Sequence, residues 1–304
     1  ALSYNNLVDA QAALALIVDF LPGAAGALPK AAGALPGAAG ASPRAAGALP
    51  DAAGVEDRAV VAILKHNTPC GVGAGATPLE AYENAFATDP ESPFGGIIVS
   101  NRSFDRALAE KVDEIFTEVL IAPSFDEDAI AVLRRKKKLR LLELGDLARF
   151  RRGGMDLRRV SGGLLVQEWD RVDERIRDAE VVTKRQPTDS EWRALEFAWV
   201  VAKHVKSNAI VYALEDRTLG VGAGQMSRVD SAKIGIEKAQ SSLEGAVMAS
   251  DAFFPFRDGV DVAAVAGVKA VIQPGGSIRD EEVVAAADEH DMTMVFAGRR
   301  LFGH

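Results

Sequence analysis

A lysine and a histidine stand side by side where an apolar run meets a proline- and glycine-containing segment. Ala59–Leu64 has the composition of a buried strand, and Lys65 and His66 follow it directly. We expect the Asn67–Gly71 segment to end regular structure there, so that both side chains serve one site although successive strand residues face opposite sides. A titratable pair at the carboxyl end of a strand is typical of sites in α/β proteins. The alternative interpretation is that Lys65 and His66 are ordinary surface residues without a catalytic role.

Alternating strand and helix patterns must position this pair, and they predict a three-layer α/β architecture. The first helix is expected to end near Phe20. Two α/β units of similar size, residues 1–185 and 186–304, suggest a duplicated architecture. The predicted strands are 59–64, 94–100, 119–122, 139–144, 160–168, 208–214, 270–273 and 292–296. The predicted helices after the first are 78–87, 104–116, 126–133, 189–205, 229–240 and 280–289.

Residues 21–55 differ from the rest of the chain. They form five seven-residue units, each with the pattern x-Pro-x-Ala-Ala-Gly-x. A seven-residue period suggests a coiled coil, but proline and glycine in every unit exclude one. We interpret the segment as a low-complexity insertion looped out from the first unit.

The composition excludes several classes of function. The 304 residues are 48% hydrophobic and carry a net charge of −8, which gives no global field for nucleic acid. The single cysteine, Cys70, excludes an intrachain disulfide and a cysteine-cluster metal site, and the four histidines lack metal-ligand spacing. Without a long apolar run or a signal peptide, we expect a cytoplasmic protein that does not bind membranes.

Three further segments carry weaker signals. Gly220–Gln225 has the spacing G-x-G-x-G, which does not fit a dinucleotide fingerprint and favours a strand that allows close backbone approach. Pro274–Ser277 precedes a helix and is able to place N–H groups near an anion. Ser250–Asp258 gathers three phenylalanines around one proline, which suits either a core plug or a slot for a flat ring with a polar rim.

Together, these segments carry a resemblance to a known family. The chain resembles the aminoimidazole carboxamide ribonucleotide (AICAR) transformylase part of the bifunctional purine biosynthesis proteins, and the matching blocks occur in family order outside the repeat. The blocks are Leu2–Asp9, Lys65–Gly71, Phe94–Gly96, Lys206–Tyr212, Gly222–Arg228, Ser250–Asp258, Pro274–Asp280 and Arg300–Phe302.

The resemblance implies formyl transfer from 10-formyltetrahydrofolate to the 5-amino group of AICAR, in de novo IMP synthesis. It implies two cytidine-deaminase-like α/β/α subdomains and a homodimer whose active sites lie at the subunit interface. His66 would be the base or proton shuttle, because a histidine pKa near neutrality suits that task. Lys65 would stabilise the oxyanion, and Asn208 would orient the formyl oxygen.

The resemblance also assigns binding residues. It places Asn6, Phe94, Glu118 and Arg300 on the AICAR side and Gln225, Phe256 and Asp258 at the folate pocket. It implies a structural monovalent cation, potassium, near Asp251. It implies no zinc, in keeping with a sequence that lacks the deaminase ligand pattern.

Two departures keep alternatives open. In the family, the cyclohydrolase domain and a phosphate-contacting arginine block precede the position of Leu2, so we expect a transformylase module without cyclohydrolase activity. The alternative is a folate- or nucleotide-binding remnant that dimerises without turnover. A deaminase-like hydrolase is a third reading, and it predicts bound zinc.

Overall fold

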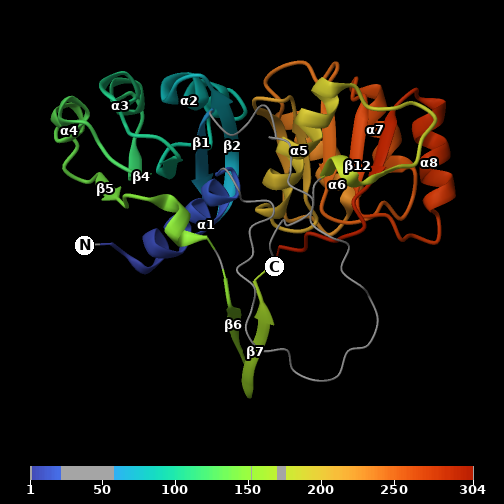
Figure 1. Cartoon of the computed structure of the whole chain (residues 1–304), viewed down its shortest axis with the longest axis horizontal. Helices are drawn as coiled ribbons and strands as arrows, with labels where there is room; N and C mark the ends of the chain where they lie inside the picture. The colour runs from blue at the N-terminus through green and yellow to red at the C-terminus, as the bar shows by residue number, and fades with distance from the viewer. Residues whose placement is uncertain (1, 22–57, 152, 170–175, 304) are drawn as a thin grey trace, which may run out of the picture.

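The computed structural model describes residues 2–21, 58–151, 153–169 and 176–303. The repeat predicted at 21–55 therefore lies outside the described residues except for Leu21. The first α/β unit contains a five-stranded sheet of order β2-β1-β3-β4-β5 (Figure 1). Its elements are α1 (Tyr4–Asp19), β1 (Ala59–Lys65), β2 (Thr68–Gly75), α2 (Pro78–Phe86), β3 (Gly96–Ser100), α3 (Arg106–Asp113), β4 (Thr117–Ala122), α4 (Glu127–Leu133) and β5 (Arg140–Glu143).

The second unit repeats this strand order and adds one strand. Its sheet runs β10-β9-β11-β12-β13-β8, and each sheet has antiparallel pairs at one end followed by three parallel strands. The duplicated α/β architecture is thus visible in the topology. The elements are β8 (Glu180–Val181), α5 (Asp189–Lys203), β9 (Ile210–Ala213), β10 (Thr218–Gly222), α6 (Arg228–Lys238), β11 (Val247–Ser250), α7 (Asp258–Val265), β12 (Ala270–Gln273), α8 (Asp280–Glu289) and β13 (Thr293–Phe296).

The predicted division at residues 185 and 186 stays a prediction. The short strand β8 precedes that point and pairs with β13 of the second sheet.

The core consists of three apolar clusters, of which one joins the two sheets. Helices α1 and α5 share one core that also takes side chains from both sheets. Helices α2, α3 and α4 cover the other face of the first sheet, and α6, α7 and α8 cover that of the second. No helix in the described part of the chain is long and apolar enough to cross a membrane.

The two sheets meet edge to edge at β2 and β10. The Ala74 amide donates to the Asp216 carbonyl at 2.6 Å, and Gly73 forms a bridge with Arg217. The Thr218 hydroxyl then takes the place of a backbone partner, because it accepts from the Val72 amide at 2.9 Å. This seam (residues 72–74 and 216–218) fixes the relative position of the units.

The expectation that Asn67–Gly71 ends regular structure is wrong. Thr68–Gly75 forms β2, which pairs antiparallel with β1 at the edge of its sheet. Pro69 is compatible with an edge strand, and glycine is needed where α2 packs against the strand. A Cβ on Gly71 would lie 2.0 Å from the Ala85 carbonyl oxygen. The glycine-rich strand predicted at Gly220–Gln225 is confirmed up to Gly222, where β10 ends, and the residues from Ala223 to Gln225 lie outside it. A Cβ on Gly222 would lie 1.8 Å from the Ser231 carbonyl oxygen, which is the same close approach of helix and strand.

The single strand predicted at 160–168 is also wrong, because the region is a hairpin. Strands β6 (Met155–Val160) and β7 (Gly163–Glu168) pair with each other and, within the described residues, with no other strand, and they project from the body of the molecule (Figure 1). Short 3-10 helices at Leu147–Phe150 and Ile176–Asp178 flank the hairpin.

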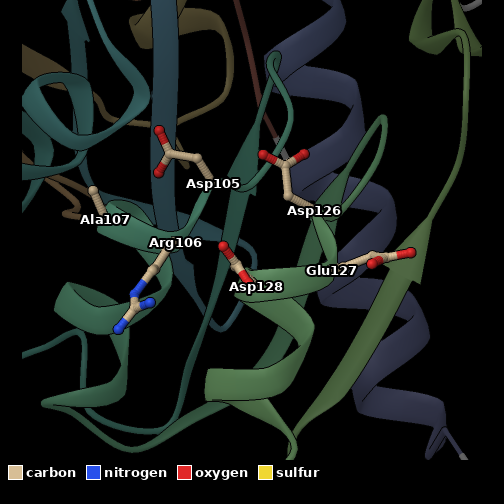
Figure 2. Close-up of a pocket in the computed structure, with 6 residues that line it drawn as sticks. All are labelled: Asp105, Arg106, Ala107, Asp126, Glu127 and Asp128. Atoms are coloured by element: carbon tan, nitrogen blue, oxygen red, sulfur yellow. The ribbon is translucent and has the colours of Figure 1, made fainter.

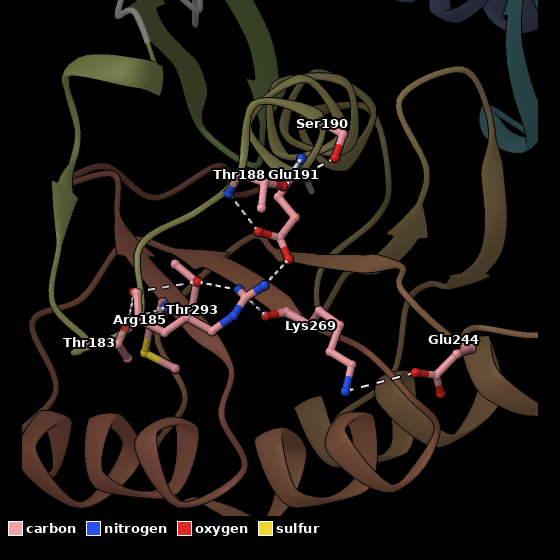
Figure 3. A network of polar contacts seen from close by, with 9 residues as sticks. Thr183, Arg185, Thr188, Ser190, Glu191, Glu244, Lys269 and Thr293 are labelled. Carbon is pink, nitrogen blue, oxygen red and sulfur yellow. Dashed lines mark hydrogen bonds and ion pairs between the residues drawn. The ribbon is translucent and has the colours of Figure 1, made fainter.

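A polar network anchors the start of α5 to the second sheet (Figure 3). Glu191 accepts from the Thr188 amide at 2.7 Å, which completes the predicted capping box, and from the Arg185 guanidinium at 2.7 Å. Arg185 also donates to the Thr293 hydroxyl of β13 at 2.6 Å. The cap therefore joins helix, loop and strand.

Replacing Glu191 with alanine should lower the free energy of unfolding by about 3 kcal/mol, because it leaves a largely buried guanidinium without its anion. Urea denaturation would measure this loss. Glu191→Gln, which keeps the cap oxygen, should lose less. Arg106→Ala breaks an exposed ion pair and should leave the unfolding midpoint nearly unchanged. Equal losses in Glu191→Ala and Arg106→Ala would contradict this interpretation.

A second polar contact joins α1 to α5. One carboxylate oxygen of Asp19, Oδ2, accepts from Lys203 Nζ at 2.9 Å and contacts His204 Nε2 at 2.7 Å. Burial opposes ionisation of Asp19, but the hydrogen bond and charge of His204 and the charge of Lys203 outweigh it and lower the pKa of the carboxyl group.

Because its pKa is lowered in the folded state, Asp19 stabilises the fold above its unfolded pKa of about 3.9. That contribution is lost as the pH falls through the lowered folded value. Asp19→Asn should therefore destabilise the protein by about 2 kcal/mol at pH 7. The gap to wild type should shrink below about pH 4. Denaturation curves across this pH range measure it, and a constant gap would contradict the assignment.

Candidate functional site

The predicted pair lies at a tight turn between β1 and β2. His66 and Asn67 are the two turn residues, with φ of 52° and 63°. Positive φ at both positions is the geometry of a type I′ hairpin turn, and histidine and asparagine are among the non-glycine residues that tolerate it. Lys65 ends β1 half-buried, and its Nζ donates to the Phe94 carbonyl at 2.8 Å. The turn leaves His66 exposed.

A pocket of about 310 Å³ opens beside this turn, between the first sheet and β10 with α6. It brings Lys65 and His66 together with Gln225 from the second unit. Its polar wall includes Asp89 and Lys238, whose side chains are 3.5 Å apart. The lining residues are Lys65, His66, Thr68, Pro69, Cys70, Thr88, Asp89, Ser92, Val221, Ala223, Gln225, Ile234 and Lys238.

Two groups in the pocket wall have shifted pKa values. Burial, followed by the charge of Asp89, raises the pKa of the Cys70 thiol to about 12, so the thiol is protonated at neutral pH. Burial opposes ionisation of Asp89, but hydrogen bonds from Ser92 lower its pKa, with help from the Glu91 amide and Lys238. Asp89 is therefore an anion in this wall, and Cys70 is no nucleophile.

Asn208 is joined to the pocket through Gln225. Its Nδ2 donates to the Gln225 carbonyl at 2.8 Å, while its Oδ1 accepts from the Arg228 guanidinium at 2.9 Å. Arg228 also pairs with the fully buried Asp251 at 2.7 Å. The second oxygen of Asp251, Oδ2, is buried without a hydrogen-bond partner among the described residues. The side-chain amide of Asn208 is therefore fixed at both its nitrogen and its oxygen.

Sequence reasoning did not single out Arg228 as a site residue. Its side chain is only 9% exposed and connects Asn208 to Asp251 and to the Phe253 carbonyl. It is the first residue of α6, after the N-cap Ser227. A cation at a helix N-terminus is electrostatically unfavourable. The position of Arg228 was therefore the feature of the sequence that could have indicated a specific anionic partner.

The residues predicted to contact AICAR fall mainly on the first unit. Asn6 of α1 is buried and its Nδ2 donates to Glu118 of β4 at 2.6 Å. Phe94 is 63% exposed, and its ring centroid lies 5.4 Å from that of Phe116. Arg300 is exposed on the second unit, and the next residue in the chain donates its amide to the Asp251 carbonyl.

The predicted folate residues are not all brought to the pocket. Gln225 lines it, whereas the exposed Phe256 and Asp258 are absent from its described lining. Arg279 lies over the Phe256 ring, with its guanidinium carbon 4.8 Å from the centroid. Asp258 begins α7, and its side chain accepts from the Gly259 amide.

A second, open pocket of about 500 Å³ lies between the starts of α3 and α4 (Figure 2). Its acidic side chains have local structural roles. Asp105 caps α3 by accepting from the Leu108 amide at 2.8 Å, and Asp126 accepts from the Ser103 hydroxyl at 2.8 Å. Arg106 pairs with Glu110. We therefore place the candidate site at the first pocket.

The first pocket, with Asn208 bound to its Gln225 carbonyl, brings near one another the groups that acyl-type transfer requires. An exposed imidazole is able to move a proton, an adjacent ammonium group is able to stabilise an oxyanion, and a fixed amide is able to orient a carbonyl oxygen.

Comparison with known proteins identifies the family of the chain. Residues 44–238 match the model of the AICARFT/IMPCHase bienzyme family. The whole chain is 52% identical to the bifunctional purine biosynthesis protein PurH of Chloroflexus aurantiacus, of which it covers 53%. It is 47% identical to the PurH protein of Acidithiobacillus ferrooxidans, of which it covers 52%. The chain thus spans about half the length of these relatives. With more than half of its residues matched by the family model, this chain belongs to the AICARFT/IMPCHase bienzyme family.

Proposed function

We propose that this chain transfers the formyl group of 10-formyltetrahydrofolate to the 5-amino group of AICAR, within purine biosynthesis. The observation that carries the proposal is the shared pocket of Lys65, His66 and Gln225, with Asn208 held on the Gln225 carbonyl. Membership of the bienzyme family supports the choice of substrates. The cytoplasmic location expected from the sequence belongs to this proposal.

The proposed reaction begins when the amine lone pair of AICAR attacks the formyl carbon. A C–N bond forms and the carbonyl electrons move to oxygen, where Lys65 stabilises the negative charge. His66 removes the proton that the amine loses, which is necessary because delocalisation makes this amine a poor nucleophile. Collapse of the oxyanion breaks the bond to the folate nitrogen. That nitrogen takes a proton, giving formyl-AICAR and tetrahydrofolate.

Asn208 would orient the formyl oxygen by a side-chain hydrogen bond. Its Nδ2 donates to the Gln225 carbonyl in this structure. We propose that one of its two N–H bonds points to the formyl oxygen in the complex, while Arg228 keeps the amide from rotating.

The proposal extends to the two binding sets. Asn6, Phe94, Glu118 and Arg300 would contact AICAR, and Gln225, Phe256 and Asp258 would contact the folate. The pairing of Asn6 with Glu118, and of Lys65 with the Phe94 carbonyl, supports a common AICAR side on the first unit. For the fold, we propose that each α/β unit is a cytidine-deaminase-like α/β/α subdomain, because the two units share strand order and directions.

A structural potassium ion is also part of the proposal. The unpartnered, buried Oδ2 of Asp251 fits such an ion, because a buried carboxylate oxygen without a donor is costly unless a cation meets it. Asp251 would hold the ion near the Asn208 loop, and the ion would stabilise the local fold without entering the reaction.

We propose that the chain forms a homodimer, and the β6–β7 hairpin supports this. One face of the hairpin carries four exposed apolar side chains (Met155, Leu157, Leu164 and Val166) on strands that pair with no other strand in the described chain. A lone two-stranded hairpin is marginally stable in water, so a covering surface is expected. Active sites at the dimer interface are part of the same proposal.

Leu157→Asp should weaken the dimer at least tenfold, because it places a charge in the proposed apolar interface. Light scattering over a concentration series would measure the change. Leu165→Asp is the matched control: Leu165 is similarly exposed but lies on the opposite face of the hairpin, and its replacement should leave the dimer intact. Equal effects of both changes, or none, would argue against this interface.

The experiment that tests the proposed function is tetrahydrofolate release from 10-formyltetrahydrofolate, with and without AICAR. AICAR-dependent release that is lost in His66→Ala supports the transformylase. Release that does not depend on AICAR contradicts it. Folate binding without any release would favour the alternative, a binding remnant.

A further inference from the structure

Helix α1 reaches the catalytic turn through one carboxylate that the proposed mechanism leaves unused. Asp9 Oδ1 accepts a hydrogen bond from the Asn67 amide at 2.8 Å, across 58 positions of sequence. Asp9 lies one helical turn after Asn6, so the two side chains share a face of α1. Asn6 is itself fixed to Glu118. That face of α1 therefore contacts both β4 and the β1–β2 turn.

The turn needs such a contact more than a hairpin turn that contains glycine does. Its two residues, His66 and Asn67, both have positive φ, where a non-glycine residue costs about 1 kcal/mol or more. His66 is exposed, so packing does little to fix its backbone. A charge-assisted hydrogen bond to the amide directly after His66 fixes the peptide plane from which the imidazole extends.

We infer that Asp9 is a positioning residue, which holds the His66–Asn67 turn in the geometry that directs Lys65 and His66 into the pocket. This inference rests on the proposed function. Asp9 acts through the Asn67 amide and has no role in proton transfer. An asparagine in its place, which still offers an acceptor oxygen, should therefore preserve most of the effect.

The kinetic test compares Asp9→Ala, Asp9→Asn and Asp105→Ala. Asp105 is the matched control, because it also accepts a backbone amide at 2.8 Å but caps α3 away from the pocket. Asp9→Ala should lower kcat at least about tenfold with KM for the folate within about twofold, because misplacement of a catalytic group lowers the rate of the chemical step. Asp9→Asn should retain most of kcat. Equal kcat in Asp9→Ala and wild type, or equal losses in Asp9→Ala and Asp105→Ala, would overturn the inference.

A second readout is independent of turnover. Hydrogen exchange of the Asn67 amide, followed by nuclear magnetic resonance, should be at least about tenfold faster in Asp9→Ala than in wild type, since the amide loses its acceptor. It should be unchanged in Asp105→Ala. If the wild-type chain were inactive, the proposed function would be rejected. The exchange rate of the Asn67 amide would then test the role of Asp9 by itself. Unchanged exchange in Asp9→Ala would overturn the inference whatever the activity.

Discussion

His66→Ala should lower the turnover of formyl transfer by about 10²- to 10⁴-fold, the range expected for loss of a general base. The protein should stay folded, because His66 is exposed and no apolar core contact is removed. His66→Asn is the sharper variant: asparagine tolerates the positive φ of this turn position, so it removes the imidazole and keeps the backbone. Single-turnover rates of formyl transfer would measure both.

Lys65→Ala should cost about 10²- to 10³-fold, because the oxyanion loses its cation. Lys65→Arg keeps the charge and should lose less. His204→Ala is the matched histidine control. Its ring contacts Asp19 between two helices, so its loss should change turnover only modestly. Activity near wild type in His66→Asn, or a loss in His204→Ala as deep as in His66→Asn, would show that the base is wrongly assigned.

Arg228→Met should have two separable effects. Arg228 and Asp251 form a buried ion pair, so removing the guanidinium should destabilise the protein by about 3–5 kcal/mol. Turnover should fall at least about tenfold in protein that remains folded, because Asn208 Oδ1 loses the donor that fixes its amide. Urea denaturation and kcat at low temperature would measure the two effects separately.

Arg228→Lys distinguishes positioning from charge. Arg228 Nη2 donates to both Asp251 and Asn208, while its Nη1 donates to the Phe253 carbonyl. Lysine keeps a cation beside Asp251, but its single nitrogen cannot hold all three acceptors in the fixed geometry of a planar guanidinium. Stability should therefore recover more than turnover does. Full recovery of turnover in Arg228→Lys would show that orientation of Asn208 does not depend on the guanidinium.

Local patterns predicted much of the fold. The Thr188 capping box, the proline at the start of α2 and the glycine-rich strand β10 all follow from short-range chemistry and agree with the structure. At β2, proline and glycine predicted a break where the structure has a strand, because an edge strand tolerates proline and because glycine there serves helix packing. The hairpin was missed because its strands have no buried face, and the continuous apolar run Leu164–Val166 gives β7 no period-2 pattern.

The site was less predictable than the fold. Lys65 and His66 are adjacent in sequence and at a strand end, so they were visible. The contact of Asn6 with Glu118 joins residues 112 positions apart, and no periodicity reports such a pair. The same holds for Asn208 and Arg228, which meet because a loop and a helix start converge on Asp251.

The seam between the sheets also determines what each half of the chain would do alone. Separated, each half would expose a glycine-containing edge strand, β2 or β10, with unpaired backbone groups. Such edges are templates for pairing with another chain, and neither strand carries a charged residue within its bounds to discourage this. The halves would therefore aggregate when produced separately. In the intact chain each half protects the other, so the seam beside the pocket also keeps β2 and β10 from pairing with other chains.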